Sequence, residues 1–137
     1  MMIISFTGTR KGMTVYQAKV FSSLLYEMGI EILIHGDCIG ADADAHVMAM
    51  AQEIEVRKRP CDIERQRAFT DGGLFIAKPE APLVRNRKIV NDGEQLIACP
   101  GTHQEELRSG TWATIRYAKR NHKPVTIIWP DGTTSVV

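Results

Sequence analysis

Short apolar runs alternate with segments of helical spacing from one end of the chain to the other. The runs that we expect to form strands are Met2 to Phe6, Ile30 to Ile34, Glu53 to Arg59, Gln95 to Cys99 and Val125 to Trp129. Helices are expected to begin near Thr14, Ala41, Pro82 and Ser109. Because strands that alternate with helices usually pair in parallel through right-handed crossovers, this pattern predicts an α/β fold. We expect a three-layer αβα domain with a central, mainly parallel sheet.

The size and composition of the chain indicate one domain that spans residues 1–137. The net charge of +1 gives no electrostatic support for nucleic acid or an anionic membrane as a partner. No apolar run approaches the roughly twenty residues of a membrane span. The three cysteines show no C-x-x-C spacing, which is typical of free thiols in a reducing compartment. We therefore expect a cytoplasmic protein that does not contact a membrane.

Two segments near the ends of this pattern are less regular. Between residues 60 and 81, glycines and prolines predict loops with one short helix around Ile63 to Phe69, and the sequence assigns this connection no role. At the C-terminal end, the Asp131-Gly132 turn predicts a small additional strand.

Glycine-bearing loops follow three of the expected strands. They are Gly8-Thr9-Arg10, His35-Gly36-Asp37 and Pro100-Gly101-Thr102. In a parallel sheet the carboxyl ends of the strands share one edge, and ligands bind there. A glycine turn that leads into a helix also presents unpaired backbone N–H groups to an anion. The sequence therefore predicts that these loops converge on an anionic ligand.

The stretch from His35 to His46 is the most informative of these loops. It follows an apolar run, turns at Gly36 and Gly40, and continues as a helix on which Asp42 and His46 share one face. A nucleotide-type ligand and a tight turn capped by Asp42 explain the stretch equally well at this point. The chain has neither a G-x-G-x-x-G nor a G-x-x-x-x-G-K-[ST] motif, which argues against an ordinary dinucleotide fold and a P-loop.

Other chemistries are possible for the same stretch. Five potential metal ligands lie close together, namely His35, Asp37, Asp42, Asp44 and His46. Because no established metal spacing is present and capping explains the aspartates, we expect no metal. Cys38 at a helix start is either a nucleophile of lowered pKa or a packing residue. Glu105 and Glu106 are either acid/base carboxylates or solvent-facing side chains.

Taken together, these loops resemble those of the SLOG superfamily. This is a Rossmann-like group that includes the LOG cytokinin-activating phosphoribohydrolases and the DNA-processing protein DprA. The resemblance covers most of the chain and is closest to short stand-alone SLOG proteins of bacteria and their phages. The segments that carry it are Phe6 to Arg10, His35 to Asp42, Arg85 to Arg87, Pro100 to Thr102 and Ser109 to Thr111.

The resemblance implies a Rossmann-like fold that binds a nucleotide or nucleotide-derived ligand, such as a nucleoside monophosphate or an ADP-ribose-like molecule. The expected ligand-binding residues are Gly8, Thr9, Arg10, His35, Gly36, Asp37, Gly40, Ala41, Asp42, Arg85, Asn86, Arg87, Pro100, Gly101, Thr102, Ser109, Gly110 and Thr111. No cofactor is expected. Relatives are commonly homodimers, and an exposed helix carrying Trp112 would suit a homodimer or higher homo-oligomer.

The resemblance also suggests two alternative functions. LOG enzymes hydrolyse the N-glycosidic bond of a nucleoside 5′-monophosphate with a Glu in a P-G-G-x-G-T-x-x-E motif, but residues 103 to 108 interrupt that motif here and Thr114 stands in place of the Glu. The first alternative is therefore an N-glycosidase or phosphoribohydrolase that uses Arg85 with Glu105 or Glu106. The second is a DprA-like module that binds single-stranded DNA, against which the near-neutral charge argues.

Overall fold

A seven-stranded sheet forms the centre of the computed structural model, which describes residues 1–137. Its strand order is β4-β3-β2-β1-β5-β6-β7, and every pair is parallel except β6 and β7. The strands are β1 (Met2–Gly8), β2 (Ile30–His35), β3 (Glu55–Lys58), β4 (Leu74–Phe75), β5 (Gln95–Cys99), β6 (Val125–Ile128) and β7 (Thr134–Val136). Because chain order runs outward in both directions from β1, the strand order reverses between β1 and β5.

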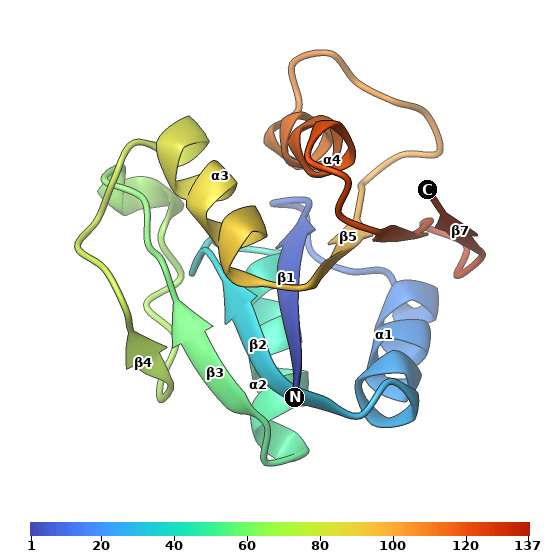
Figure 1. Ribbon diagram of the computed structural model, residues 1–137, viewed down its shortest axis with the longest axis horizontal. Helices are drawn as coiled ribbons and strands as arrows, with labels where there is room; N and C mark the ends of the chain where they lie inside the picture. Colours follow the sequence, from blue (N-terminus) through green and yellow to red (C-terminus); the bar gives the residue numbers. More distant parts are fainter.

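Helices cover both faces of this sheet (Figure 1). They are α1 (Val15–Glu27), α2 (Ala41–Ala51), α3 (Pro82–Asp92) and α4 (Gly110–Arg120). The helices α1 and α2 pack on one face, and α3 and α4 lie on the other. This is the expected three-layer αβα architecture with a mainly parallel sheet. No helix combines the length and the apolar composition that crossing a bilayer requires.

Alternating side chains along the central strands build a separate core on each face. Leu33 of β2 and Ile97 of β5 pack with α1 and α2, whereas their neighbours Ile32 and Leu96 pack toward α3 and α4. Both sides of these strands are therefore apolar, as expected for a sheet that helices cover on both faces.

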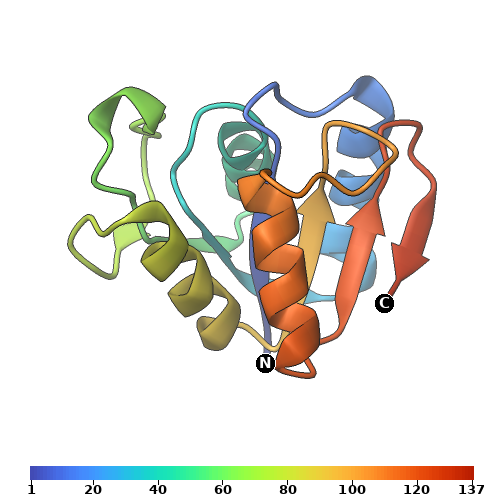
Figure 2. The same ribbon diagram turned by 90° about the horizontal axis from the view of Figure 1, so that it is seen from above.

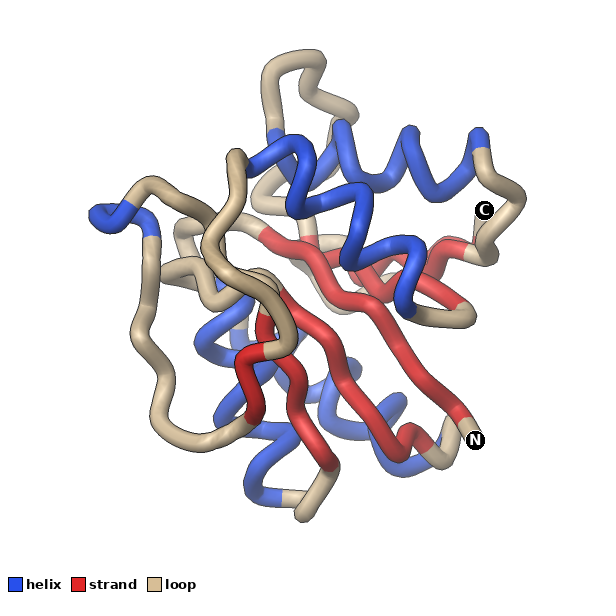
Figure 3. Tube along the Cα trace, turned by 60° about the vertical axis from the view of Figure 1, so that its left-hand side comes forward, coloured by secondary structure: helices blue, strands red, loops and turns tan.

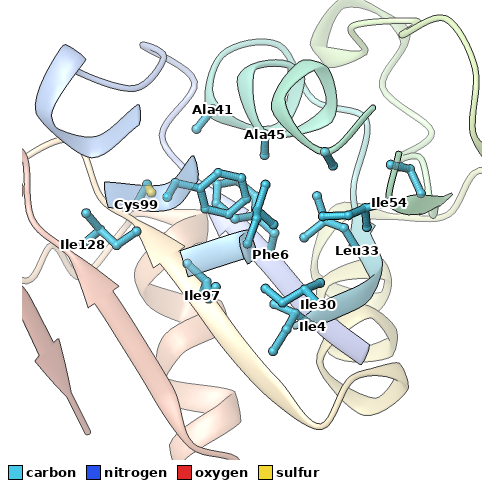
Figure 4. Close-up of a cluster of buried hydrophobic side chains, with 14 residues drawn as sticks. Ile4, Phe6, Ile30, Leu33, Ala41, Ala45, Ile54, Ile97, Cys99 and Ile128 are labelled. Carbon is cyan, nitrogen blue, oxygen red and sulfur yellow. The ribbon is translucent and has the colours of Figure 1, made fainter. Parts of the chain in front are cut away.

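Small side chains bring α2 close to the sheet. Ala41 and Ala45 project from α2 toward the cluster around Phe6 in Figure 4, and both are fully buried. The close approach extends to the end of β1, where a Cβ on Gly8 would lie 2.5 Å from the Ala41 Cβ. Only glycine at position 8 allows the start of α2 to lie against the end of β1.

Local signals set the helix starts as expected. Thr14 caps α1, and its hydroxyl and the Gln17 side chain exchange hydrogen bonds with each other's backbone N–H groups at 3.0 Å. Ser109 caps α4 by accepting a hydrogen bond from Trp112 N–H at 3.3 Å.

The connection between β3 and α3 differs from the expectation in two details. The short helix is a 3-10 turn of Glu64–Gln66, and the two-residue edge strand β4 was not predicted. Both residues of β4 are exposed, so no alternation of apolar and polar residues reveals it. Figure 3 shows this connection mostly as loop, with one short helical turn. The small C-terminal strand, β7, is present as predicted.

Candidate functional site

The loops that follow β1, β2 and β5 converge at one edge of the sheet, as the sequence predicts (Figure 2). Residues from all three loops, including Gly8, Gly36 and Gly101, line a single cavity of about 460 Å³. Backbone hydrogen bonds join the loops: Thr9 N–H donates to the Cys99 carbonyl at 3.0 Å, and Ala41 N–H donates to the Thr9 carbonyl at 2.9 Å. The cavity therefore lies at the carboxyl edge, where the strand order reverses.

Three helices begin beside this cavity. Asp42 of α2, Pro82 of α3, and Gly110 and Thr111 of α4 all line it. At the start of α4 the Ser109 hydroxyl accepts a hydrogen bond from the Trp112 N–H. The N–H groups of Gly110 and Thr111, which precede Trp112, have no acceptor within the helix. The unpaired N–H groups and the helix dipoles make this end of the cavity favourable for an anion.

Basic side chains add positive charge around the same cavity. Arg10, Lys11 and Arg108 line it, are exposed, and make no side-chain ion pair within the protein. The acidic residues that line it are Asp42, which is buried, and Glu106, whose carboxylate accepts a hydrogen bond from the Thr102 hydroxyl at 2.8 Å. The solvent-accessible charge around the opening of the cavity is therefore mainly positive, although the chain as a whole is almost neutral.

Asp42 holds the turn that precedes its own helix. Its Oδ2 atom accepts hydrogen bonds from the N–H groups of Gly36 at 3.1 Å and Cys38 at 3.2 Å. Burial raises the pKa of this carboxyl group to about 6, although the nearby Arg85 guanidinium opposes the shift. Asp42 thus caps the turn, as one of the two interpretations of this stretch expected, while Gly40 occupies the N-cap position of α2.

Arg85 is a buried side chain that holds backbone around the cavity. Its guanidinium donates to the carbonyl groups of Gly36 at 2.7 Å and Arg59 at 3.1 Å, and to the Asn86 side chain at 2.8 Å. A further contact reaches the Cys38 sulfur at 3.4 Å. Most of its N–H groups are thus already satisfied, so Arg85 contributes a fixed positive charge next to the cavity.

Cys38 lines the cavity but is not suited to act as a nucleophile. Burial raises the pKa of its thiol to about 11, and the Asp42 carboxylate adds to that effect. Because the thiolate is the reactive form of cysteine, the structure favours the packing interpretation of Cys38.

His35 and Asp37 point away from the cavity into a buried polar network. His35 Nδ1 accepts from the Asp37 N–H at 2.9 Å, and His35 Nε2 contacts His46 Nδ1 at 2.9 Å. His46 Nε2 in turn lies 2.6 Å from the Asp71 carbonyl. These partners assign both rings as neutral Nε2–H tautomers, and burial lowers the pKa of His35 to about 3. The network ties β2 and α2 to the loop before β4.

No group of three or more His, Cys, Asp and Glu side chains is arranged to hold a metal ion. The carboxylate of Asp37 accepts from the N–H of Thr70 at 3.1 Å and from its hydroxyl at 2.7 Å. The crowding of these residues in the sequence therefore reflects three separate hydrogen-bonding roles: Asp42 holds the turn, His35, Asp37 and His46 form the buried network, and Asp44 accepts from the Met13 N–H.

Several expected site residues do not line the cavity but lie outside its lining. They are Gly40, Ala41, Arg87, Pro100, Thr102 and Glu105. Gly40 packs against the backbone of Arg10, and Glu105 pairs with Arg116 at 2.8 Å.

Trp112 is buried and packs on Trp129 with ring centres 5.8 Å apart. Because α4 turns this side chain into the core, Trp112 does not supply the exposed helix face that would suit a homodimer.

Other lining residues were missed in the sequence. They are Lys11, Gln66, Leu83, Arg108 and Thr114, among others. Lys11 follows Arg10 in the sequence, and Arg108 precedes Ser109. This adjacency to two predicted site residues was the only sequence signal that could have indicated Lys11 and Arg108. Gln66 reaches the cavity from the irregular segment between β3 and β4, where no pattern indicated it.

The architecture is shared with several solved structures. A molybdenum cofactor binding protein from the phototrophic bacterium Rippkaea orientalis has a TM-score of 0.71 at 20% identity, over 93% of this chain and 76% of that one. DprA from Streptococcus pneumoniae (TM-score 0.65, 16% identity) and DprA from Helicobacter pylori (0.65, 20%) each match 92% of this chain. The chain shares the fold of these three proteins. No family model matches the sequence, and no curated protein is similar enough to match it.

The expected Rossmann-like fold is thus confirmed, and the resemblance to DprA holds at the level of the fold. The chain spans 49% and 64% of the lengths of the two DprA structures. Sequence identities of 16–20% support a common fold but do not identify the ligand. The ligand has to be inferred from the residues that line this cavity.

Proposed function

We propose that this protein binds a phosphorylated nucleotide or a nucleotide-derived ligand at the carboxyl edge of its sheet. The observation that carries the proposal is the meeting of the glycine loops with the N-terminus of α4 in one cavity, where Gly110 and Thr111 present free N–H groups. A phosphate group placed there would accept those N–H bonds and would lie beside the unpaired cations of the mouth.

The size and lining of the cavity support a small ligand with an organic part. A volume of about 460 Å³ lies within the usual range for small-molecule sites, roughly 300–1,000 Å³. Apolar side chains, among them Phe6, Leu83 and Ile89, accompany the polar groups of the lining. A base or sugar would contact these side chains while the phosphate occupies the helix end.

The comparisons agree with ligand binding without specifying the ligand. One structure with this fold is a molybdenum cofactor binding protein, and another shows the single-stranded DNA binding mode of DprA. Both are consistent with a carboxyl-edge site for an anionic partner, and the near-neutral charge of this chain favours a small ligand over nucleic acid.

Calorimetric titration with nucleoside 5′-monophosphates and with the matching nucleosides tests the proposal. We expect binding of at least one monophosphate and at least tenfold weaker binding of its nucleoside. Arg108→Gln should weaken monophosphate binding about tenfold, equivalent to about 1.4 kcal/mol. Lys119→Gln is the control because Lys119 is exposed on α4 but does not line the cavity. Failure of every monophosphate to bind would contradict the proposal.

Hydrolysis of the bound nucleotide is the second candidate function. Glu106 favours it because its carboxylate lines the cavity, whereas Glu105 is held by Arg116. If turnover occurs, incubation with a nucleoside monophosphate should release free base, and Glu106→Gln should abolish that release without abolishing binding. Binding without release by the unmodified protein would favour a sensor or sequestering role.

A further inference from the structure

The cavity continues into a second recess between α3 and α4. This groove has a volume of about 230 Å³ and shares three lining residues with the main cavity: Leu83, Asn86 and Thr114. The two spaces are therefore contiguous, and α3 and α4 lie side by side along the groove (Figure 2). A ligand that fills the main cavity could extend along these helices without leaving the protein surface.

The charged side chains that line the groove are all basic. They are Arg87 of α3 and Arg116 and Arg120 of α4. Arg116 is neutralised by Glu105 at 2.8 Å, but Arg87 and Arg120 are exposed and have no acidic partner. The chain as a whole has 17 Lys and Arg against 16 Asp and Glu, so a lining with three arginines and no acidic side chain is a local feature of this groove.

An aromatic ring lines the groove together with these cations. Tyr117 is part of the groove lining, and the Arg87 guanidinium lies 5.6 Å from its ring centre. The Tyr117 hydroxyl donates to the Asn91 side chain at 2.9 Å, which fixes the orientation of the ring. Unpaired arginines beside a fixed aromatic ring are suited to a phosphate group with a base or sugar attached.

We propose that the groove is a second subsite, and that the natural ligand is a dinucleotide whose second phosphate is held by Arg87 and Arg120. This inference rests on the proposed function, because it assigns the first nucleotide unit to the main cavity. Its new content is the place of the second phosphate, which lies in the groove between α3 and α4 rather than in the main cavity.

Charge argues for such a ligand over a second copy of the chain at this face. A symmetric contact through the groove would bring Arg87 and Arg120 of both copies together without any acidic partner. Like charges placed opposite each other in an interface are unfavourable. The second phosphate of a dinucleotide would instead neutralise both side chains.

Matched titrations test the inference. The probes are adenosine 5′-monophosphate, a 5′-phosphorylated diadenylate joined by a phosphodiester, and ADP-ribose. The two phosphates of ADP-ribose share one bridging oxygen, so they cannot reach both the N-terminus of α4 and the arginines at the far end of the groove. We expect the diadenylate to bind at least tenfold more tightly than the monophosphate and than ADP-ribose.

The decisive variant is Arg87→Gln/Arg120→Gln, and its control is Lys19→Gln/Lys119→Gln. All four side chains are exposed, and the control removes the same charge outside the cavity and the groove. The arginine variant should lose at least tenfold affinity for the diadenylate and change its monophosphate affinity less than twofold. The lysine variant should keep both affinities.

Other outcomes overturn the inference in distinguishable ways. Monophosphate binding with equal affinity for all probes, or an arginine variant that behaves like its control, would reject the second subsite and leave the proposed function standing. Failure of every probe, also when the other common bases replace adenine, would reject both. Affinity that keeps rising for a single-stranded DNA decamer would indicate a nucleic-acid-binding protein. A change of sedimentation coefficient in the arginine variant alone would indicate a protein interface.

Discussion

Asp42 and Arg85 hold the two polar groups of the same glycine residue. The Asp42 carboxylate accepts from the Gly36 N–H at 3.1 Å, and the Arg85 guanidinium donates to the Gly36 carbonyl at 2.7 Å. Both side chains are buried, and they come from helices on opposite faces of the sheet. The loop after β2 is therefore fixed between two layers of the fold before any ligand enters.

Gly36→Ala should destabilise the protein by about 2 kcal/mol. A Cβ at this position would lie 2.5 Å from Arg85 Nη1 and 3.1 Å from Asp42 Oδ2, so the guanidinium would have to leave its carbonyl acceptors. Urea unfolding measures the loss. Gly110→Ala is the control, since nothing lies within 4 Å of a Cβ there. Equal stability of the two variants would show that the site can relax around position 36.

Asp42→Asn should change how stability depends on pH. The pKa of Asp42 is about 6 in the folded protein and lies above its ordinary value of 3.8, so the folded state binds the proton more tightly. The resulting stabilisation is complete below pH 3.8 and is lost as the pH rises through 6. From pH 4 to pH 7, wild type should lose on the order of 2–3 kcal/mol relative to Asp42→Asn. Parallel stability curves would contradict the shift.

His35→Gln should produce a pH effect of the opposite sign. The pKa of His35 is about 3 in the folded protein, below its ordinary value of 6.5, because burial disfavours the charged ring. Stability from the neutral ring is therefore complete above pH 6.5 and is lost as the pH falls toward 3. Wild type should lose stability relative to the variant over this window, at about 1.4 kcal/mol per pKa unit. Chemical unfolding at pH 7 and pH 4.5 provides the measurement.

Ser109→Ala and Thr14→Ala form a matched pair of helix-cap variants. Each removes a hydroxyl that caps a helix, at α4 or α1, so each should lose about 1 kcal/mol of stability. Ser109→Ala alone should also weaken nucleoside monophosphate binding, because the N-terminus of α4 borders the cavity and the N-terminus of α1 does not. Thermal unfolding and calorimetry on the same samples measure both effects. If both variants bind equally well, α4 does not contact the phosphate.

Much of the fold could be predicted because its signals are local. Apolar runs, the Thr14 and Ser109 caps and the glycine turns each act within a few residues, so they can be identified along the sequence. The edge strand β4 could not be predicted because two exposed residues carry no alternation. That strand exists through its hydrogen bonds to β3, which are contacts between distant segments.

The site was predictable only in part, for the same reason. Because the strands pair in parallel, the three glycine loops that follow them had to meet at one edge of the sheet. The cavity lies at that edge and is lined by residues of all three loops. The direction of each side chain within a loop was not predictable. Gly36 and Asp42 reach the cavity, whereas His35 and Asp37 turn into the buried network under the Thr70 segment.

The sequence by itself determined the alternation of strands and helices, and through it the edge of the sheet at which the loops would meet. Only the tertiary structure decided that the Arg85 guanidinium bonds to backbone carbonyl groups and that Trp112 lies in the core. It also decided that Arg10 and Arg108 line the cavity, and Arg87 and Arg120 the groove, without an ion-pair partner. The physical reason is that periodicity and caps depend on neighbours in the chain, whereas burial and pairing depend on segments that meet only after folding.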